Sequence, residues 1–293
     1  MKYRALFGLT ILVLISPVKS FAQTGLMKTK AEYFPEVLFL DCVYEEHIYN
    51  KIDDERIRIK YDCGIGFQDN YKEKLYGKMI LQVGSTHSKF TSPILHAADS
   101  AMMAKNDRIK FFLFKNANPI FDLISLYTDL KTGEVIFDER MITEDFEYID
   151  NPPAIVWEIN DEVETILNHK CTKAVGEFRG RIYEAWFTEE IPVSAGPWKL
   201  RGLPGVILKA KESEGACEFE AISILEGNGI IEKPDYPYIN VSIKQYHSLL
   251  KQYLKAPGKF SSLHLSRTPG MTSSHVPGYK EKPIRPFVIL EKE

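Results

Sequence analysis

The chain has 293 residues, of which 37 are basic and 40 acidic, giving a net charge of −3. A mildly acidic surface gives no reason to expect nucleic acid or an anionic lipid surface as a partner, and we predict neither. A chain of this length can bury a substantial core without disulfides or metals, as one large β domain or two small ones.

A secretory signal peptide is predicted at the N-terminus. Lys2 and Arg4 form a short basic region, and the apolar run over residues 5–15 is too short to span a bilayer. Small residues at the end of the segment predict cleavage after Ala22, so residues 1–22 are expected to be removed. An uncleaved membrane anchor is the alternative.

Cleavage would remove three basic residues and no acidic one, which lowers the net charge to −6. No later segment holds about 18 consecutive apolar residues, so no membrane span is expected after cleavage. We therefore expect the mature chain to be periplasmic or secreted.

Short strands rich in β-branched and aromatic residues are predicted through most of residues 23–260. In the first half they cover residues 37–44, 56–61, 79–83, 109–114, 123–130 and 134–137. In the second half they cover residues 154–159, 164–175, 181–188, 206–211 and 216–224. A tight turn is expected at Thr132-Gly133. The short polar connections favour antiparallel neighbours.

Two helices interrupt this pattern. Ser92 followed by Pro93 predicts the start of a helix over residues 94–104. Ser242, with Gln245 three residues on, forms a capping-box sequence before an apolar stripe of helical spacing, which should pack on a sheet. After this helix, residues 261–293 are rich in Ser, Pro, Lys and His, and a loosely ordered tail is expected.

Four cysteines remain after cleavage, and none forms a C-x-x-C pair. Cys42 and Cys63 lie on two strand-like runs, so a disulfide across a hairpin is a candidate. Cys171 and Cys217 would lie about three strands apart, or about 14 Å, which is too far for a bond unless the sheet curls. Reduced, buried thiols are the alternative for both pairs.

Residues 192–208 stand out because they combine three prolines and three glycines with apolar side chains that favour burial. A constrained apolar loop is ordered, and ordered loops often bind ligands. Leu203 to Val206 has the residue preferences of a type II turn. The candidate ligand-binding residues are Pro192, Gly196, Pro197, Trp198, Lys199, Arg201, Gly202, Leu203, Pro204 and Gly205.

Lys199 and Arg201 flank Leu200 in this loop. In an extended loop both cations would point to one side, and Trp198 and Leu200 to the other. The result would be a cationic rim over an apolar patch, suited to an amphiphile or a peptide carboxylate. Solvated side chains are the alternative.

A family resemblance rests on five short motifs spread in order over about 60 residues: Trp157-Glu-Ile, Cys171-Thr-Lys-Ala, Gly180-Arg-Ile-Tyr-Glu-Ala-Trp-Phe-Thr, Ile191-Pro-Val-Ser-Ala-Gly-Pro and Gly202-Leu-Pro-Gly-Val-Ile. The chain resembles the GLPGLI family, exported Bacteroidetes proteins without an established function. It departs from the name motif at Val206, where the family has leucine, a conservative change. The resemblance implies a Gram-negative envelope location and assigns no catalytic residue.

The sequence mostly lacks the motifs of known catalytic and metal-binding sites. Ser194 is not in a G-x-S-x-G elbow. His169 and Cys171 share one face of a strand, yet no second ligand pair lies nearby in sequence. We therefore predict no catalytic residue, no metal site and no cofactor.

Acidic residues form two groups that deserve comparison. One group is expected at a hairpin tip, and the other directly precedes the marked loop. Paired carboxylates can perform acid–base chemistry, although solvated surface acids are far commoner. The residues concerned are Asp161, Glu162 and Glu164 in the first group, and Glu189 and Glu190 in the second.

The expected fold is mainly β: a single curved antiparallel sheet or half-barrel, with one or two helices on its concave face. A β-sandwich is the alternative. The preferred function is non-enzymatic binding of an apolar or amphiphilic ligand, lipid or peptide, gated by residues 192–205. The alternatives are a structural partner of an outer-membrane transport system and a carboxylate-dependent hydrolase.

Overall fold

The structure is a computed structural model that describes residues 49–68, 70–97, 124–141, 144–235, 237–256 and 290–291. The predicted signal peptide and the predicted strands 37–44 and 109–114 lie outside these residues. Chain contacts separate Met1–Cys42 from Val43–Glu293, and the description below concerns the second unit.

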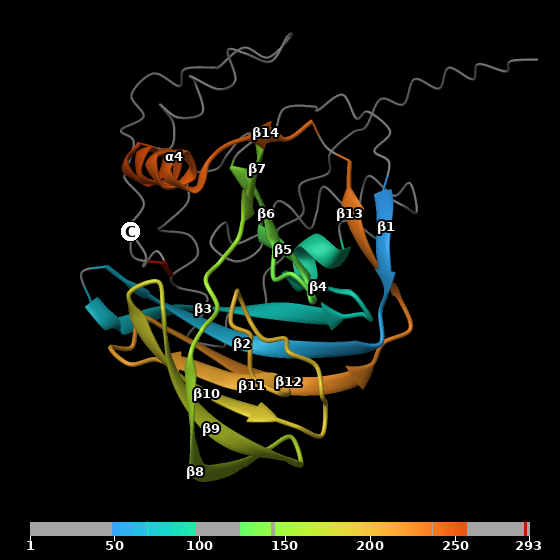
Figure 1. Ribbon diagram of the computed structural model, residues 1–293. Helices are drawn as coiled ribbons and strands as arrows, with labels where there is room; N and C mark the ends of the chain where they lie inside the picture. The colour runs from blue at the N-terminus through green and yellow to red at the C-terminus, as the bar shows by residue number, and fades with distance from the viewer. Residues whose placement is uncertain are drawn as a thin grey trace, which may run out of the picture. The chain divides into compact units, whose positions relative to one another are not determined.

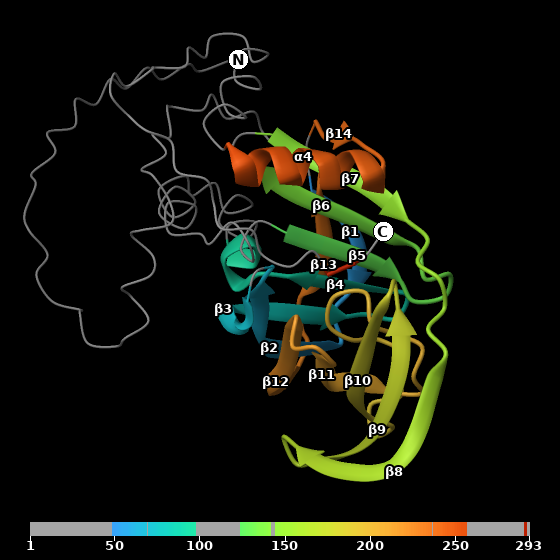
Figure 2. The same ribbon diagram turned by 90° about the vertical axis from the view of Figure 1, so that its left-hand side faces the viewer.

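Twelve strands form one large curved sheet that does not close into a barrel (Figures 1 and 2). Their order is β14-β7-β6-β5-β4-β3-β2-β12-β11-β10-β9-β8. Their bounds are β2 Ile57–Phe67, β3 Asn70–Val83, β4 His87–Thr91, β5 Ile124–Asp129, β6 Val135–Met141, β7 Glu144–Asp150, β8 Trp157–Ile166, β9 His169–Phe178, β10 Arg181–Thr188, β11 Val206–Glu212, β12 Cys217–Glu226 and β14 Ile239–Asn240. The prediction of a mainly β fold built on a curved sheet is confirmed.

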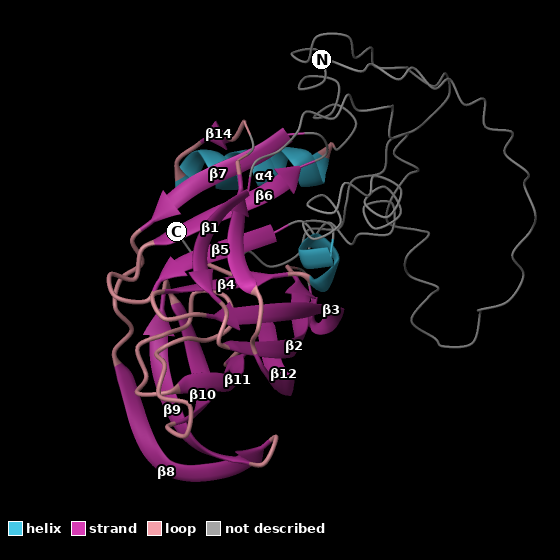
Figure 3. Ribbon diagram, turned by 90° about the vertical axis from the view of Figure 1, so that its right-hand side faces the viewer, coloured by secondary structure: helices cyan, strands magenta, loops and turns pink. Residues whose placement is uncertain are grey.

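The sheet is mixed, so the prediction of a purely antiparallel sheet is wrong at one edge. β14 pairs with β7 in parallel, through Ile239 and Phe146. β14 reaches β7 after a separate pair, in which β1 (Tyr49–Asp54) and β13 (Ile230–Pro234) form a two-stranded antiparallel sheet. No hairpin joins β14 to β7, so nothing forces them to be antiparallel. Figure 3 shows how strands dominate the architecture.

Two-residue turns join β8, β9 and β10, which are the last three strands in the sheet order. Leu167 and Asn168 connect β8 to β9, with φ values of 49° and 67°. Arg179 and Gly180 connect β9 to β10, again with positive φ at both positions. These are the backbone conformations of tight hairpins whose twist matches the strands. The predicted single strand over residues 164–175 is therefore wrong, because the turn at Leu167 divides it. Gly133, with φ of 84°, confirms the predicted turn between β5 and β6.

The acidic group Asp161, Glu162 and Glu164 lies within β8 rather than at a hairpin tip. The pairing with β9 skips from Ile159 to Val163, so the strand bulges there. A bulge and a turn share local signals, which explains the error.

The paired strands form a buried row of side chains across one face. Cross-strand partners share a face, and this row is Ile159, Ala174, Ala185, Ala210, Phe219 and Cys63, from β8 to β2. All except Ile159 are buried. The opposite face carries charged side chains, such as Lys173 paired with Glu162 at 3.1 Å and Lys209 with Glu164 at 2.8 Å. From β8 to β2 the core therefore lies on one face of the sheet, as period-2 alternation predicts, whereas consecutive residues at the end of β3 and in β4 are buried on both faces.

Both predicted helix starts are confirmed. The helix α4, Ile243–Lys255, follows Ser242, and the capping box with Gln245 is present. Residues 93–97 are helical, and the Leu95 backbone N–H donates to Ser92 Oγ at 2.9 Å. Among the described residues, no helix has the length and apolar character needed to cross a membrane.

Cys63, Cys171 and Cys217 are buried free thiols. Cys42 lies outside the described residues, so the Cys42–Cys63 disulfide stays a prediction. β10 and β11 separate the strands that carry Cys171 and Cys217, as the sequence predicted. Within the expected loose tail 261–293, Leu290 and Glu291 are buried, and the expectation for the tail as a whole stays a prediction. The other tail residues lie outside the described part of the chain.

Candidate functional site

The loop between β10 and β11 packs into the core. Ala195, Leu200 and Leu203 are all at most 3% exposed. The Ile207 backbone N–H donates to the Ala195 carbonyl at 2.9 Å, which ties the loop to the first residues of β11. The alternation of proline, glycine and large apolar residues thus produces an ordered loop whose apolar side chains fill part of the core. We call this loop between β10 and β11 the plug.

Glycines permit this packing for two different reasons. Gly202 has φ of 101°, a conformation that other residues rarely adopt. A type II turn over Leu203 to Val206 would require a positive φ at Gly205. Gly205 is not among the residues with a positive φ, so the predicted type II turn is wrong. A Cβ at Gly205 would instead lie 1.9 Å from the Thr188 carbonyl oxygen. The glycine is needed because two backbone segments touch.

Lys199 is buried at the centre of an ionic cluster. Its Nζ lies 2.7 Å from Asp150 Oδ2 and 2.5 Å from Glu291 Oε1, and it donates to the Tyr148 hydroxyl at 3.2 Å. Arg179 contacts the same two carboxylates, at 2.6 and 3.2 Å. Two cations thus face two carboxylates in a buried, internally balanced group. The prediction of a solvent-facing cationic rim is therefore wrong for Lys199.

Arg201 is also used internally. Its guanidinium donates to the Leu130 carbonyl at 2.9 Å, beside the turn at Gly133. Burial lowers the pKa of this side chain. Its own carbonyl accepts a hydrogen bond from the Trp157 indole at 2.8 Å. Arg201 therefore joins the loop to two parts of the sheet that are distant in sequence.

Trp198 has φ of 56°, a strained conformation for a large residue. Its ring packs edge-on against Phe137 at 5.9 Å, and Lys199 lies over it. Its indole nitrogen has no hydrogen-bond partner among the described residues. Such strain persists where the surroundings fix the conformation, which fits a plug held by the core.

A buried carboxyl lies two residues after Phe137 in β6. Glu139 of β6 accepts a hydrogen bond from the Tyr246 hydroxyl of α4. Burial raises the pKa of Glu139 to about 8, although the bond from Tyr246 opposes the shift. The Tyr246 ring also contacts Phe137 and Tyr148, at 5.0 and 5.1 Å. This cluster attaches α4 to β6 and β7.

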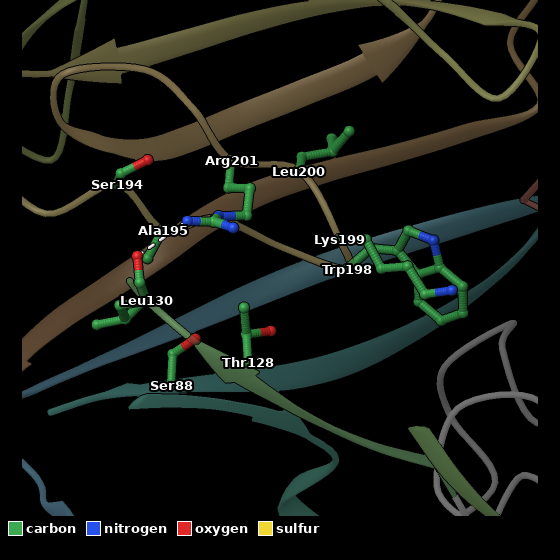
Figure 4. Close-up of a pocket in the computed structure, with 10 residues that line it drawn as sticks. Ser88, Thr128, Leu130, Ser194, Ala195, Trp198, Lys199, Leu200 and Arg201 are labelled. Carbon is green, nitrogen blue, oxygen red and sulfur yellow. Dashed lines mark hydrogen bonds between the residues drawn. The ribbon is translucent and has the colours of Figure 1, made fainter. Parts of the chain in front are cut away.

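The small cavity beside the loop has about 10 Å³ of space open to a water molecule. Figure 4 shows Ser88 and Thr128, from β4 and β5, on one side, and loop residues including Arg201 on the other. This volume suits about one water molecule and no organic ligand.

Of the ten candidate residues, the structure buries or half-buries seven, and leaves Pro192, Gly202 and Pro204 exposed. The buried or half-buried ones are Gly196, Pro197, Trp198, Lys199, Arg201, Leu203 and Gly205. Their role in binding a ligand stays a prediction. Sequence reasoning missed Glu139, Asp150 and Glu291. Their only signal was an acidic residue in an otherwise strand-like or tail segment, which surface positions share.

The other candidate chemistry is dispersed or structural. Glu190 is exposed, and its carboxylate binds His169 Nδ1 at 2.7 Å and accepts the Lys170 backbone N–H at 3.1 Å. Burial raises the pKa of Cys171 to about 11, which opposes a reactive thiolate. Within the described ranges, no group of three or more His, Cys, Asp or Glu side chains is placed to hold a metal ion.

Comparisons with known proteins are limited in reach. Residues 177–209 match a family described as "Protein of unknown function (Porph_ging)", a stretch that spans β10, the whole loop and the first residues of β11. No curated protein matches the chain. Two crystal forms of PNGF-II are similar in structure, each with a TM-score of 0.47 over 68% of this chain, at 18% and 17% identity. The matched part spans about a third of those chains, 34% and 33%.

Proposed function

We propose that the chain is an exported, non-enzymatic binding protein of the cell envelope, and that its ligand is an amphiphilic polypeptide segment. The burial of Lys199 carries this proposal. Of the two loop cations that a gated pocket could offer to an anionic ligand, Lys199 is already neutralised by Asp150 and Glu291, and Arg201 donates to the Leu130 carbonyl. The adjoining cavity suits a single water. A binding surface outside the loop fits these observations better than a pocket beneath it.

The proposed cellular context follows from the sequence. The signal peptide 1–22, cleaved after Ala22, would deliver the chain to the periplasm. The GLPGLI-like motifs suggest a Bacteroidetes envelope. In this proposal α4 covers the concave face together with the loop, since Tyr246 and Trp198 contact the same Phe137 ring. The loop then acts as a structural plug.

Replacing Trp198 by alanine distinguishes a loop that stabilises the core from a loop that controls access to a pocket. We expect Trp198→Ala to lower the free energy of unfolding by about 3 kcal/mol, the lower end for large aromatic truncations, because the side chain is half-buried. Binding of an apolar dye by the folded protein should not change. The measurements are urea unfolding and a fluorescence titration with the dye. An undiminished stability together with lost dye binding would contradict the proposal and favour a gated pocket.

The ligand class is tested by an unbiased selection. A displayed library of random peptides is panned against the mature chain, and lipids extracted from protein purified from periplasm are measured in parallel. We expect enriched peptides and no stoichiometric lipid. A stoichiometric lipid without peptide enrichment would refute the proposed function.

A further inference from the structure

The strand β8 ends the large sheet, and the apolar rows of the core stop there unfinished. The described residues pair β8 only with β9 (Figures 1 and 2). Ile159 ends the row of buried side chains that crosses five strands, yet it is 54% exposed. Val163 ends a second row, through Thr172 and Phe187, and is 52% exposed. Each row would gain an apolar neighbour if one more strand were added.

The opposite face of β8 has a defined charge. Its row runs from Glu158 through Val175 to Glu184, Lys211 and Glu218, so acids and a base follow one another across the sheet. Lys211 and Glu184 form an ion pair of 3.0 Å. Glu158 is exposed and has no ion pair among the described residues. A basic side chain on an added strand would complete this row.

The two ends of the sheet differ. At the far end, β14 covers the edge of β7. β8 has a bulge and acidic residues, devices that proteins use to discourage edge pairing. The acids would also face one another if two copies paired through β8, which argues against self-association. A basic strand would meet no such repulsion.

We propose that β8 is a docking edge for an extended segment of a partner protein that alternates apolar and basic residues. The apolar residues lie beside Ile159 and Val163 on the core face, and a basic residue lies opposite Glu158. Backbone hydrogen bonds to the edge supply affinity, and the alternation supplies specificity. The proposal rests on the proposed function and adds the surface and the chemistry of the ligand.

The test uses labelled peptides of the ten-residue length of β8, one alternating lysine with valine and the other glutamate with valine. Fluorescence anisotropy with the mature chain measures both. We expect the lysine peptide to bind at least about tenfold more tightly, and to weaken with added salt. The variant Ile159→Lys should bind the lysine peptide at least about tenfold more weakly than the unmodified chain does. The control Ile149→Lys, on β7 with a similar exposure of 58%, should leave binding unchanged.

A charge exchange makes the proposal specific. Glu158→Lys should reduce the preference for the lysine peptide at least about tenfold and improve binding of the glutamate peptide. Equal binding of both peptides, or equal loss in the Ile159 and Ile149 variants, would overturn the docking edge. So would a concentration-dependent dimer that Ile159→Lys abolishes, because the occupant would then be a second copy.

Failure of the edge and failure of the proposed function give different results. If peptides from the random library bind Ile159→Lys as well as the unmodified chain, the edge proposal is wrong and the binding function stands. If the library yields no binder at all, both are wrong.

Discussion

Replacing Lys199 by methionine removes a buried cation while keeping most of the side-chain volume. Asp150 and Glu291 would then keep only Arg179, which contacts each of them once. Removing one partner of a buried ion pair costs about 3–5 kcal/mol, chiefly because a buried charge is left uncompensated. Arg179 remains, so we expect the lower end, a loss of about 3 kcal/mol in the free energy of unfolding.

Lys209→Met is the matched control. Lys209 lies 2.8 Å from Glu164, but both side chains are partly exposed, at 25% and 40%. Exposed pairs contribute about 0–1 kcal/mol, so the control should change stability little. Urea unfolding followed by tryptophan fluorescence gives both values. Equal, small losses in the two variants would refute the reasoning about Lys199.

A second substitution checks the cause of the loss. If unpaired carboxylates produce it, Asp150→Asn added to Lys199→Met should not destabilise further, because the amide removes one buried negative charge. A double variant much less stable than Lys199→Met alone would show that packing, rather than charge, explains the effect.

The remaining predictions concern a buried acid and a close backbone contact. Burial raises the pKa of Glu139 to about 8 from an ordinary value of 4.5, so the folded state holds the Glu139 proton more tightly than the unfolded state does. The free energy of unfolding should therefore fall as pH rises between these two pKa values, by on the order of 4 kcal/mol. Glu139→Gln should remove most of this slope in urea unfolding between pH 5 and 8, and an unchanged slope would contradict the assignment. Gly205→Ala should cost about 3 kcal/mol or more, since its Cβ would strike the Thr188 carbonyl. Gly215→Ala, where nothing lies within 4 Å and only the φ of 85° is strained, should cost about 1–2 kcal/mol, and an equal cost at both positions would contradict the close-contact explanation.

Local signals predicted much of the secondary structure. Alternation identified the second-half strands, and the capping box identified α4, because both depend on neighbouring residues. The turn at Leu167 was missed because leucine is not a typical turn residue and continues the apolar pattern. Gly205 was misassigned because sequence alone does not separate a glycine needed for positive φ from one needed for close contact.

Long-range contacts were beyond prediction. Lys199 was read as a surface cation because its partner Asp150 lies 49 residues away, and no local feature marks either residue as buried. The same reasoning applies to Glu291, whose segment has the composition of a loose tail. Pairing between distant charges depends on how the sheet curves, and periodicity carries no information about that curvature.

The position of the family match bears on where binding occurs. The matched stretch, residues 177–209, includes β10 and the loop but not β8. Within it, Lys199 and Arg201 bind partners on other parts of the sheet, so the distinctive loop residues hold the curved sheet together. Residues that stabilise the fold cannot be substituted freely to suit different ligands. A free edge such as β8 can instead change its apolar and acidic side chains with little effect on the core. If the loop supports the fold and β8 selects the partner, substitutions in the loop should lower stability first, and substitutions at Ile159 should alter binding at unchanged stability.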